Sequence, residues 1–260
     1  MGFSDELGNR MKEYYENITK TKLMRRCPVV IRLDGKAWHT FTRGFQKPFD
    51  SVLMKSMQQT MEYLCKNIQG CVFGYTQSDE ITLVLIDYQT LTTDAWFGYE
   101  VQKLCSVSAS MATIAFNKFF YKNAGHWLSL TPDNNDAHNI GIAYGRGMEN
   151  DAMFDSRCFN IPKEEVCNLI CWRQSDATRN SIQMVGRVYF SHGELKDRSC
   201  NDIQDMLMQN YNVNWNDFPT MCKRGSACIY KDGKWVVDTE MPILKGVDRN
   251  YVNQYVFVGE

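Results

Sequence analysis

The sequence lacks any long hydrophobic run, since polar residues interrupt its apolar stretches well short of the roughly 18 residues that a membrane-spanning helix needs. The first residues, MGFSDELGNRMKEYYEN, are charged, so no secretory signal is expected. With 44% apolar and 23% charged residues, the composition is that of a soluble globular protein. We therefore expect a cytoplasmic protein with no membrane partner.

The sequence also lacks any C-x-x-C pair, although it contains 10 cysteines. Cys167 and Cys171 would share one face of a helix, but no histidine or second cysteine pair stands near them at zinc spacing. The cysteines are scattered through a large chain, so we expect free and mostly buried thiols rather than disulfides.

Net charge is nearly absent as well. The formal value of −1 argues against a protein that coats nucleic acid through its overall field. The exception is KTKLMRR, residues 20–26, which contains Lys20, Lys22, Arg25 and Arg26. This basic segment would suit phosphate, and it would equally suit a solvated approach to the strand that follows.

The order of predicted elements in the first half indicates the fold class. Residues 28–34 (PVVIRLD) form a β-branched run that ends in a turn, and an Asp-Ser start at residue 50 precedes apolar residues at helical spacing. Residues 71–85 (CVFGYTQSDEITLVL) predict a hairpin, and residues 95–120 predict a second helix. Strand, helix, strand, strand, helix begins the split β-α-β repeat of ferredoxin-like folds, so we predict an α+β domain.

The second half is predicted to form an appended region. The segment 130–156 is rich in Asn, Asp and Gly and has weak periodicity, so we expect a boundary near residue 137, with a catalytic domain over 1–136 and a C-terminal α+β domain over 137–260 packed on it. From Pro162 the sequence predicts two helices that meet around Trp172 and Asp176, and residues 224–237 predict a hairpin turned by Asp-Gly.

Two carboxylates are candidates for a metal site. Asp34 ends the first predicted strand and Asp79 lies in the hairpin turn, and these two elements are neighbours in the predicted sheet. Converging carboxylates repel each other unless a cation lies between them, and Mg²⁺ is commonly held by one or two carboxylates together with water and phosphate oxygens. Gly35 lets the backbone approach such a ligand closely. The pair is the minimum for two-metal phosphoryl transfer, although each acid could also belong to a solvated turn.

Several motifs together resemble the tRNA(His) guanylyltransferase family. They are RLDGKAWHTFT (32–42), KPFD (47–50), GYTQSDEITLVL (74–85), WFGYEVQKL (96–104), FDSRCFNIP (154–162) and CWRQSDATRNS (171–181). They cover nearly the whole chain in the order found in the family. The resemblance implies an enzyme with a polymerase-like palm domain that adds nucleotides to the 5′ end of tRNA in the 3′-to-5′ direction.

The resemblance also implies roles for individual residues. Asp34 and Asp79 would hold two Mg²⁺ ions with help from the Gly35 carbonyl, and Glu80 would be the adjacent catalytic acid. The implied nucleotide-binding residues are Gly35, Lys36, Ala37, Trp38, His39, Lys47, Asp50, Ser78, Asp79 and Lys103. The residues expected to contact tRNA are Lys20, Lys22, Arg25, Arg26, Arg173 and Asn180.

Two of these residues also have an interpretation from local sequence alone. Lys103 stands near the start of a predicted helix, where a cation and free backbone N–H groups suit phosphate. His39 is flanked by Trp38 and Phe41, so it could be a packed core histidine instead of a ligand-binding residue.

Two departures from the family pattern bear on the substrate. Eukaryotic members that guanylate tRNA(His) have His-Ile-Asn-Asn where this chain has TRNS (178–181), and a basic residue where it has Glu100. Both differences resemble the bacterial and archaeal branch, whose members favour template-dependent repair of truncated tRNA. The resemblance implies ATP or GTP as activating substrate, an incoming NTP, and a homotetramer. The alternatives are another palm-type nucleotidyl transferase or cyclase, and a non-catalytic tRNA-binding protein.

Overall fold

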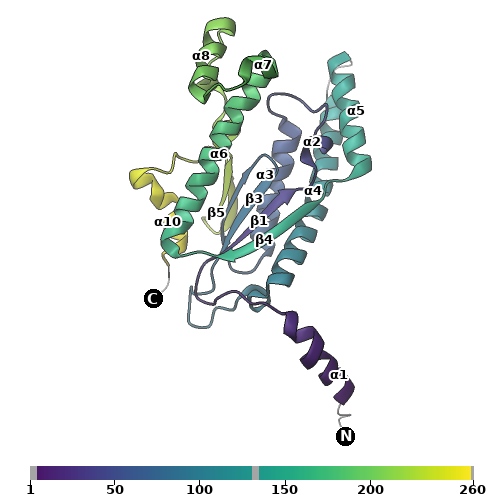
Figure 1. Ribbon diagram of the computed structural model, residues 1–260, viewed down its shortest axis with the longest axis vertical. Coiled ribbons are helices and arrows are strands. Elements are labelled where there is room, and N and C mark those ends of the chain that lie inside the picture. Colours follow the sequence, from purple (N-terminus) through teal and green to yellow (C-terminus); the bar gives the residue numbers. More distant parts are fainter. Residues whose placement is uncertain (1–4, 131–134, 259–260) are drawn as a thin grey trace.

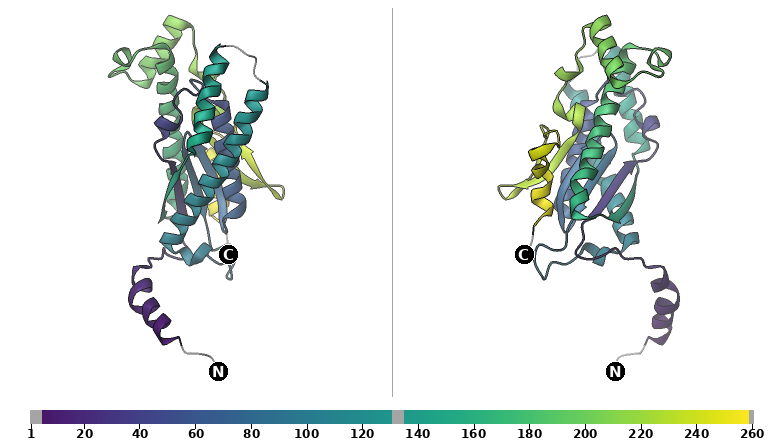
Figure 2. Two further views of the ribbon diagram at one scale, coloured as in Figure 1. Left: turned by 90° about the vertical axis from the view of Figure 1, so that its right-hand side faces the viewer. Right: turned by 60° about the vertical axis from the view of Figure 1, so that its left-hand side comes forward.

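The computed structural model describes residues 5–130 and 135–258. Within them, six strands form one antiparallel sheet in the order β4-β1-β3-β2-β5-β6. The strands are β1 (Val29–Gly35), β2 (Cys71–Gln77), β3 (Glu80–Leu85), β4 (Phe154–Asn160), β5 (Ser226–Lys231) and β6 (Lys234–Asp238). Helices cover both faces of this sheet (Figures 1 and 2).

One face of the sheet packs against α3 (Ser51–Asn67) and α4 (Val101–Leu130), and α5 (Asn135–Asn150) follows α4. Side chains alternate between the faces of a strand, so every second residue of β1 and β3 enters this core. The buried residues of α4 include Ser108, Ala112 and Ala115, whose small side chains let the helix lie close to the sheet.

The other face packs against α6 (Lys163–Tyr189) and α10 (Asn250–Val256). Because β3 is covered on both faces, all of its residues are buried, which explains its nearly continuous apolar sequence. The far end of α6 extends beyond the sheet and packs against α8 (Cys200–Tyr211) in a separate apolar cluster (Figure 1).

The remaining helical segments are short. They are α1 (Glu6–Met11), a π-helical turn (Lys12–Glu16), α2 (Trp38–Phe41), α7 (His192–Leu195), α9 (Thr220–Arg224) and 3₁₀ turns at Asn17–Thr19, Trp96–Tyr99, Trp215–Asp217 and Gly246–Arg249. The segment from α1 to Thr19 buries none of its residues, and α1 projects away from the sheet (Figure 1). None of the helices in the described ranges is long and apolar enough to cross a bilayer.

Most of the local predictions are confirmed. The strand at 28–34, the hairpin at 71–85 and the helix after residue 50 all form, and the Asp50 side chain caps that helix by accepting a hydrogen bond from the Leu53 N–H at 2.8 Å. The closing hairpin also forms, with φ of 51° at Asp232 and 78° at Gly233. Such positive φ values match the turn chemistry that Asp-Gly favours.

The second half departs from the sequence interpretation in two places. Residues 131–134 of the weakly periodic segment lie outside the described residues, but 135–150 form α5 and 154–160 form β4. Burial of Ala143, Tyr144 and Gly147 stabilises α5 despite its poor helix-forming composition. In place of two helices, α6 is one continuous helix, because its apolar residues keep one period from Val166 to Val185.

The expected division between residues 136 and 137 stays a prediction, but the sheet is continuous across it. Strand β4 pairs with β1, and β5 pairs with β2, so both expected regions contribute to one sheet.

All ten cysteines are free thiols, as expected. Three of them, Cys65, Cys167 and Cys228, are buried and the other seven are only partly buried, so the expectation of mostly buried thiols is wrong.

Candidate functional site

Asp34 lies at the end of β1, between two antiparallel neighbours. Its Cα pairs with that of Glu80 on β3 and with that of Asp155 on β4. Directly paired residues direct their side chains to the same face, so three acidic residues lie side by side on the face that α6 covers. Burial, followed by the nearby Asp155 and Glu80 carboxylates, raises the pKa of Asp34.

Asp79 lies in the two-residue turn between β2 and β3. Ser78, the other turn residue, has a φ of 51°, and the Gly35 N–H donates to the Asp79 carbonyl oxygen at 3.2 Å. This hydrogen bond ties the turn to the end of β1. Burial and the neighbouring Asp34 raise the pKa of Asp79 to about 6, although a hydrogen bond from Ser78 acts in the opposite direction. The structure therefore brings Asp34, Gly35 and Asp79 together, while their metal-binding role stays a prediction.

Glu80 is adjacent to Asp79 in sequence but has a different environment. Its Oε1 accepts from Arg173 Nε at 2.7 Å, and its Oε2 accepts from Arg32 Nη2 at 2.7 Å. The side chain is only 5% exposed. Both carboxylate oxygens are thus bound by guanidinium groups, and the pair with Arg173 connects α6 to the hairpin.

Sequence reasoning missed two charged residues of β4 that lie beside Asp34. Arg157 Nη2 lies 3.9 Å from Asp34 Oδ2 and 3.3 Å from Asp155 Oδ1. Their sequence, FDSRCFNIP, was part of the family resemblance, but only the pairing of β4 with β1 places these side chains at the site. Arg157 partly offsets the repulsion between the two acids and is exposed enough to contact an anion.

The carboxylate oxygens of Asp34 and Asp79, at the end of β1 and in the β2–β3 turn, fit a hard divalent cation. Burial is the largest cause of the raised pKa of Asp34 and of Asp79, and nearby carboxylates raise the pKa of both further, so a cation at this position would stabilise their charged forms. In residues 5–130 and 135–258, no group of three or more His, Cys, Asp and Glu side chains could hold a metal ion. The protein would therefore contribute two carboxylates, leaving other coordination positions to water and phosphate.

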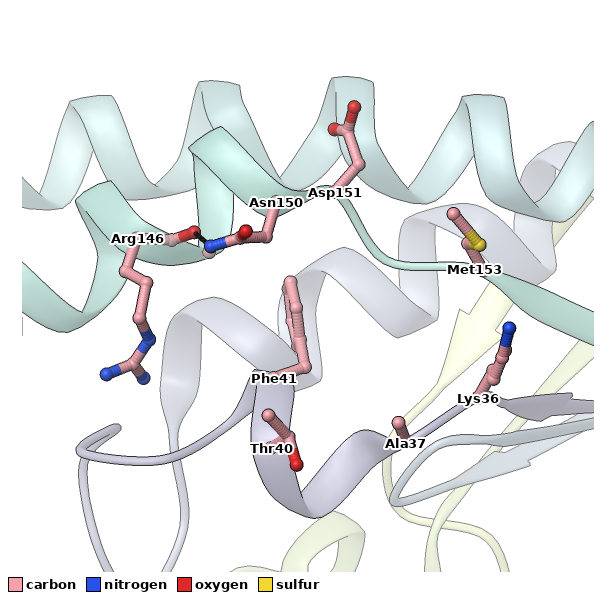
Figure 3. A pocket seen from close by; sticks show the side chains of 9 residues that line it. Lys36, Ala37, Thr40, Phe41, Arg146, Asn150, Asp151 and Met153 are labelled. Atoms are coloured by element: carbon pink, nitrogen blue, oxygen red, sulfur yellow. Dashed lines mark hydrogen bonds between the residues drawn. The ribbon is translucent and has the colours of Figure 1, made fainter.

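Four of the predicted nucleotide-binding residues, Lys36, Ala37, Asp50 and Ser78, line two separate cavities. A cavity of about 110 Å³ includes Asp50, Ser78 and Asn180 among its lining residues. A second cavity, of about 310 Å³, includes Lys36 and Ala37 and extends to α5 (Figure 3). Since the sheet order is β4-β1-β3-β2, the carboxylates lie between the larger cavity on the β1 and β4 side and the smaller one beside the β2–β3 turn.

Gly35 and Trp38 depend on each other for packing. Trp38 is buried, with its ring centroid 5.3 Å from that of Phe116 and 5.6 Å from that of Phe154. A Cβ on Gly35 would lie 2.3 Å from the Trp38 ring, so a larger residue cannot fit without movement. His39 follows Trp38 but is exposed, and the alternative of a packed core histidine is therefore wrong.

Of the KPFD residues, Lys47 is exposed, whereas Asp50 is buried and saturated with hydrogen bonds. The Asp50 carboxylate accepts from the Leu53 N–H at 2.8 Å, the Gln46 N–H at 2.9 Å and the Tyr144 hydroxyl at 2.8 Å. Burial nevertheless raises its pKa. Its clearest role is to fix the start of α3 and the loop before it.

Lys103 is the third residue of α4, near the helix start as predicted, but at the opposite end of the sheet from Asp34. Two contacts between α4 and β4 show this. Near Lys103, Cys105 Sγ lies 3.6 Å from the Sγ of Cys158, which pairs with Ile31 in the middle of β1. Further along α4, Thr113 accepts from the N–H of Phe154 at 3.2 Å, and Phe154 pairs with Gly35, next to Asp34. The structure thus separates Lys103 from the carboxylates of its own chain. Its Nζ lies 5.5 Å from the centre of the Phe97 ring.

The basic segment 20–26 lies at this same end of the sheet. The backbone of Lys22 pairs with that of Glu100, just before α4, and Lys22 is exposed. Lys20 contacts Glu16 at 3.1 Å. Arg25 contacts the buried Asp87 at 2.5 Å, and the Arg26 N–H donates to the same carboxylate at 2.8 Å. This part of the expected tRNA-binding surface is therefore distant from Asp34 within one chain.

The other two residues expected to contact tRNA lie on α6 and differ in exposure. Arg173 is buried and paired with Glu80 and Asp176, so the expectation that it contacts tRNA is wrong for this arrangement. Asn180 is exposed and lines the smaller cavity.

Comparisons with known proteins agree with the motifs. The model of the family described as tRNAHis guanylyltransferase matches residues 8–162. The tRNA(His) guanylyltransferase of Saccharomyces cerevisiae is 26% identical over 230 residues, which cover 82% of this chain and 86% of that protein. A probable tRNA(His) guanylyltransferase of Dictyostelium discoideum is 22% identical over 268 residues, which cover 98% of this chain and 95% of that protein.

Solved structures of bacterial tRNA(His) guanylyltransferase-like proteins are also similar to this chain. The structure of a bacterial tRNA(His) guanylyltransferase-like protein in complex with ATP has a TM-score of 0.84 and 41% identity, covering 97% of this chain and 100% of that one. The structure of such a bacterial protein in complex with GTP has a TM-score of 0.77 and 38% identity, and the match covers 98% of this chain and 100% of that one. The family model matches more than half of the residues, and the motif resemblance is confirmed. This chain belongs to the tRNA(His) guanylyltransferase family.

Proposed function

We propose that this protein is a Mg²⁺-dependent nucleotidyltransferase that adds nucleotides to the 5′ end of tRNA in the 3′-to-5′ direction. The proposal rests on one observation above all. In a chain of this family, Asp34 and Asp79 converge beside Gly35, where β1 ends and the β2–β3 turn lies. The names of its relatives and the ATP and GTP complexes of its bacterial counterparts support the reaction and the nucleotide substrates.

The strand order supports a ferredoxin-like palm domain. Helix α3 connects β1 to β2, α4 precedes β4, and the four strands lie in the order β4-β1-β3-β2, which is the split β-α-β arrangement. This order brings the end of β1 next to the β2–β3 turn. The two acids therefore follow from the topology rather than from a chance approach of two loops.

Asp34, Asp79 and the Gly35 carbonyl would hold the metal ions. Bound Mg²⁺ would activate the attacking oxygen and shield the charge of the triphosphate and of the leaving pyrophosphate. Arg157, 3.9 Å from Asp34, would contact phosphate oxygens beside the acids. Glu80 would act as a positioning residue, since Arg32 and Arg173 already occupy its two oxygens.

The proposed reaction uses two nucleotide-bearing substrates. A 5′-monophosphate is first activated when one of its oxygens attacks the α-phosphate of ATP, which releases pyrophosphate and leaves an adenylylated 5′ end; alternatively, the tRNA begins with a 5′-triphosphate. The 3′-hydroxyl of the incoming NTP then attacks the 5′ α-phosphate, and AMP or pyrophosphate leaves. Base pairing with the opposite strand selects the nucleotide, so the protein need recognise only the shape and the end of the tRNA. The TRNS sequence at 178–181 and Glu100 favour general 5′-end repair over strict guanylation of tRNA(His).

The experiment is an extension assay with a 5′-truncated tRNA, ATP, GTP and Mg²⁺. We expect products longer by templated nucleotides, with at least a 100-fold loss of rate for Asp79→Asn because charge stabilisation at the phosphoryl group depends on that carboxylate. Asp205→Asn, an exposed acid on α8, is the matched control and should retain the wild-type rate. Running tRNA(His) beside a non-His tRNA separates guanylation from repair. Absence of extension by the wild-type protein would refute the proposal.

A cytoplasmic homotetramer is part of this proposal. The net charge of −1 is too small for one chain to attract RNA strongly through its overall field. Lys22 and Lys103 lie at the end of the sheet opposite Asp34, where they would suit RNA held at the site of a neighbouring subunit. Light scattering with a concurrent extension assay tests this, since full activity of a monomer would contradict it.

A further inference from the structure

Two cysteines lie against each other where helix α4 packs on the edge strand β4. Cys105 of α4 and Cys158 of β4 have their Sγ atoms 3.6 Å apart, although 53 positions separate them in the sequence. A disulfide bond needs a sulfur–sulfur distance of about 2.05 Å. The two sulfur atoms therefore have to approach by only roughly 1.5 Å to form one.

The contacts around this pair hold the helix and the strand together. Ser108, three residues along α4, lies 2.8 Å from Ser156 through their hydroxyl oxygens. On the strand side, Cys158 pairs with Ile31 in the middle of β1, and its Sγ lies 3.9 Å from the Val101 carbonyl oxygen. Contacts other than the two thiols thus fix how α4 and β4 meet, so the sulfur atoms face each other before any bond forms.

This pair is accessible, in contrast to another group of neighbouring thiols. Cys105 and Cys158 are both partly exposed, because β4 is the last strand on its side of the sheet (Figure 1). Cys65 interacts with Cys71 and Cys228, but Cys65 and Cys228 are buried in the core. A dissolved oxidant therefore reaches Cys105 and Cys158 more readily than it reaches a pair that includes Cys65.

We propose that Cys105 and Cys158 form a redox-reactive thiol pair, which a low-molecular-weight disulfide of the glutathione type converts to an intramolecular disulfide. The Cys105 thiolate attacks one sulfur of the oxidant, which breaks the S–S bond of the oxidant and releases one glutathione thiolate. The Cys158 thiolate then attacks Cys105 Sγ, which forms the bond between the two cysteines and releases the second glutathione thiolate. Two cysteine sulfurs are thereby oxidised, two glutathione sulfurs are reduced, and the glutathione thiolates take up the two protons.

The environment of Cys158 sets the order of these two steps. Burial, followed by the neighbouring Cys105 thiol, raises the pKa of Cys158 to about 12, so little of its thiolate is present at neutral pH. Cys158 is therefore a poor first nucleophile, and it reacts once Cys105 is held beside it as a mixed disulfide. In a reducing compartment the pair would remain as two thiols, so the disulfide would form only under oxidising conditions.

The disulfide would tie the edge strand to α4. The bond would close a loop of 53 residues, which removes conformational freedom from the unfolded chain. Arg157, the residue before Cys158, lies beside Asp34 on the other face of the sheet, so the bond would also hold this part of the site in place. The thiol pair would close in this way whether or not the protein adds nucleotides to tRNA.

Peptide mapping of the full chain tests the pair. The reduced protein is incubated with oxidised glutathione, the remaining thiols are alkylated, and the peptides are separated without reductant and identified by mass spectrometry. We expect a peptide that joins Cys105 to Cys158, and dithiothreitol should restore both thiols. Cys105→Ser and Cys158→Ser should each lose the joined peptide. Cys200→Ser, at a partly buried cysteine on α8, is the matched control and should retain it.

Thermal melting shows whether the bond forms within the native fold. Oxidation should raise the melting temperature of the wild-type protein and of Cys200→Ser by at least about 5 °C, and leave that of Cys105→Ser unchanged. Absence of the joined peptide from the oxidised wild-type protein would overturn the inference. A wild-type melting temperature that rises no more than that of Cys105→Ser would also overturn it. Neither measurement uses enzymatic activity, so the extension assay decides the proposed function separately.

Discussion

The ion pair between Glu80 and Arg173 gives a sharp prediction, because it connects the hairpin that bears Asp79 to helix α6. The two side chains are 5% and 7% exposed, and Arg173 Nε lies 2.7 Å from Glu80 Oε1. We consider the substitution Arg173→Met, which keeps the length of the side chain and removes its charge. Glu80 would then retain Arg32, 2.7 Å from its other oxygen.

The expected cost follows from burial. Removing one partner of a buried ion pair costs about 3–5 kcal/mol, because the other charge is left without compensation. Since Arg32 remains, we expect the lower end, about 3 kcal/mol. Arg179→Met is the matched control on the same helix, since Arg179 contacts the same Asp176 but is 66% exposed. An exposed ion pair contributes less than about 1 kcal/mol.

The assay is urea unfolding of Arg173→Met, Glu80→Gln, the double variant and Arg179→Met. We expect the two single substitutions at the buried pair to be non-additive, with a coupling of about 1–3 kcal/mol. If Glu80 positions the turn, Arg173→Met will also slow tRNA extension. A cost for Arg173→Met no larger than that for Arg179→Met, or strict additivity, would refute the reasoning.

Three further predictions concern the same part of the molecule. The pKa of Asp79 is about 6 in the folded protein and about 4 in an unfolded chain, so the contribution of this carboxyl to stability is present below pH 4 and lost as the pH rises through 6. Without metal, Asp79→Asn should therefore increase the free energy of unfolding in urea by about 1–2 kcal/mol at pH 7.5 and leave it unchanged at pH 4. A decrease at pH 7.5 would contradict this. Gly35→Ala should cost about 1–3 kcal/mol in thermal unfolding, because its Cβ would lie 2.3 Å from the Trp38 ring. Its control, Gly145→Ala in α5, has no atom within 4 Å of the new Cβ and should gain up to about 1 kcal/mol, so equal effects would disprove the packing argument. Asp50→Ala should cost about 1–2 kcal/mol and speed hydrogen exchange in the first turn of α3, and unchanged exchange there would argue against the cap.

The proximity of Asp34 and Asp79 was predictable from sequence, because it depends on local signals. A β-branched run predicts β1, alternating and apolar residues predict the hairpin, and the order of elements predicts which strands are neighbours. The Asp50 cap was predictable for the same reason, since an Asp-Ser start before apolar residues at helical spacing marks a helix.

The surroundings of the acids were not predictable, because they depend on contacts distant in sequence. Glu80 is paired with Arg173, 93 residues away, and no local pattern shows which face of α6 meets the sheet. Helix α5 forms because Tyr144 and its neighbours are buried, although Asn and Gly favour a loop. Strand β4 is polar and lies at the sheet edge, so the positions of Asp155 and Arg157 emerge only from its pairing with β1.

The central claim is that Asp34 and Asp79 together promote templated addition at the 5′ end of tRNA. The most direct measurement is the single-turnover rate of extension of a 5′-triphosphorylated, truncated tRNA, with the opposing base varied among four substrates. The account predicts that the added nucleotide follows the opposing base and that Asp34→Asn and Asp79→Asn each abolish extension while both variants remain folded. Extension by either variant at the wild-type rate, or no extension by the wild-type protein, would contradict it.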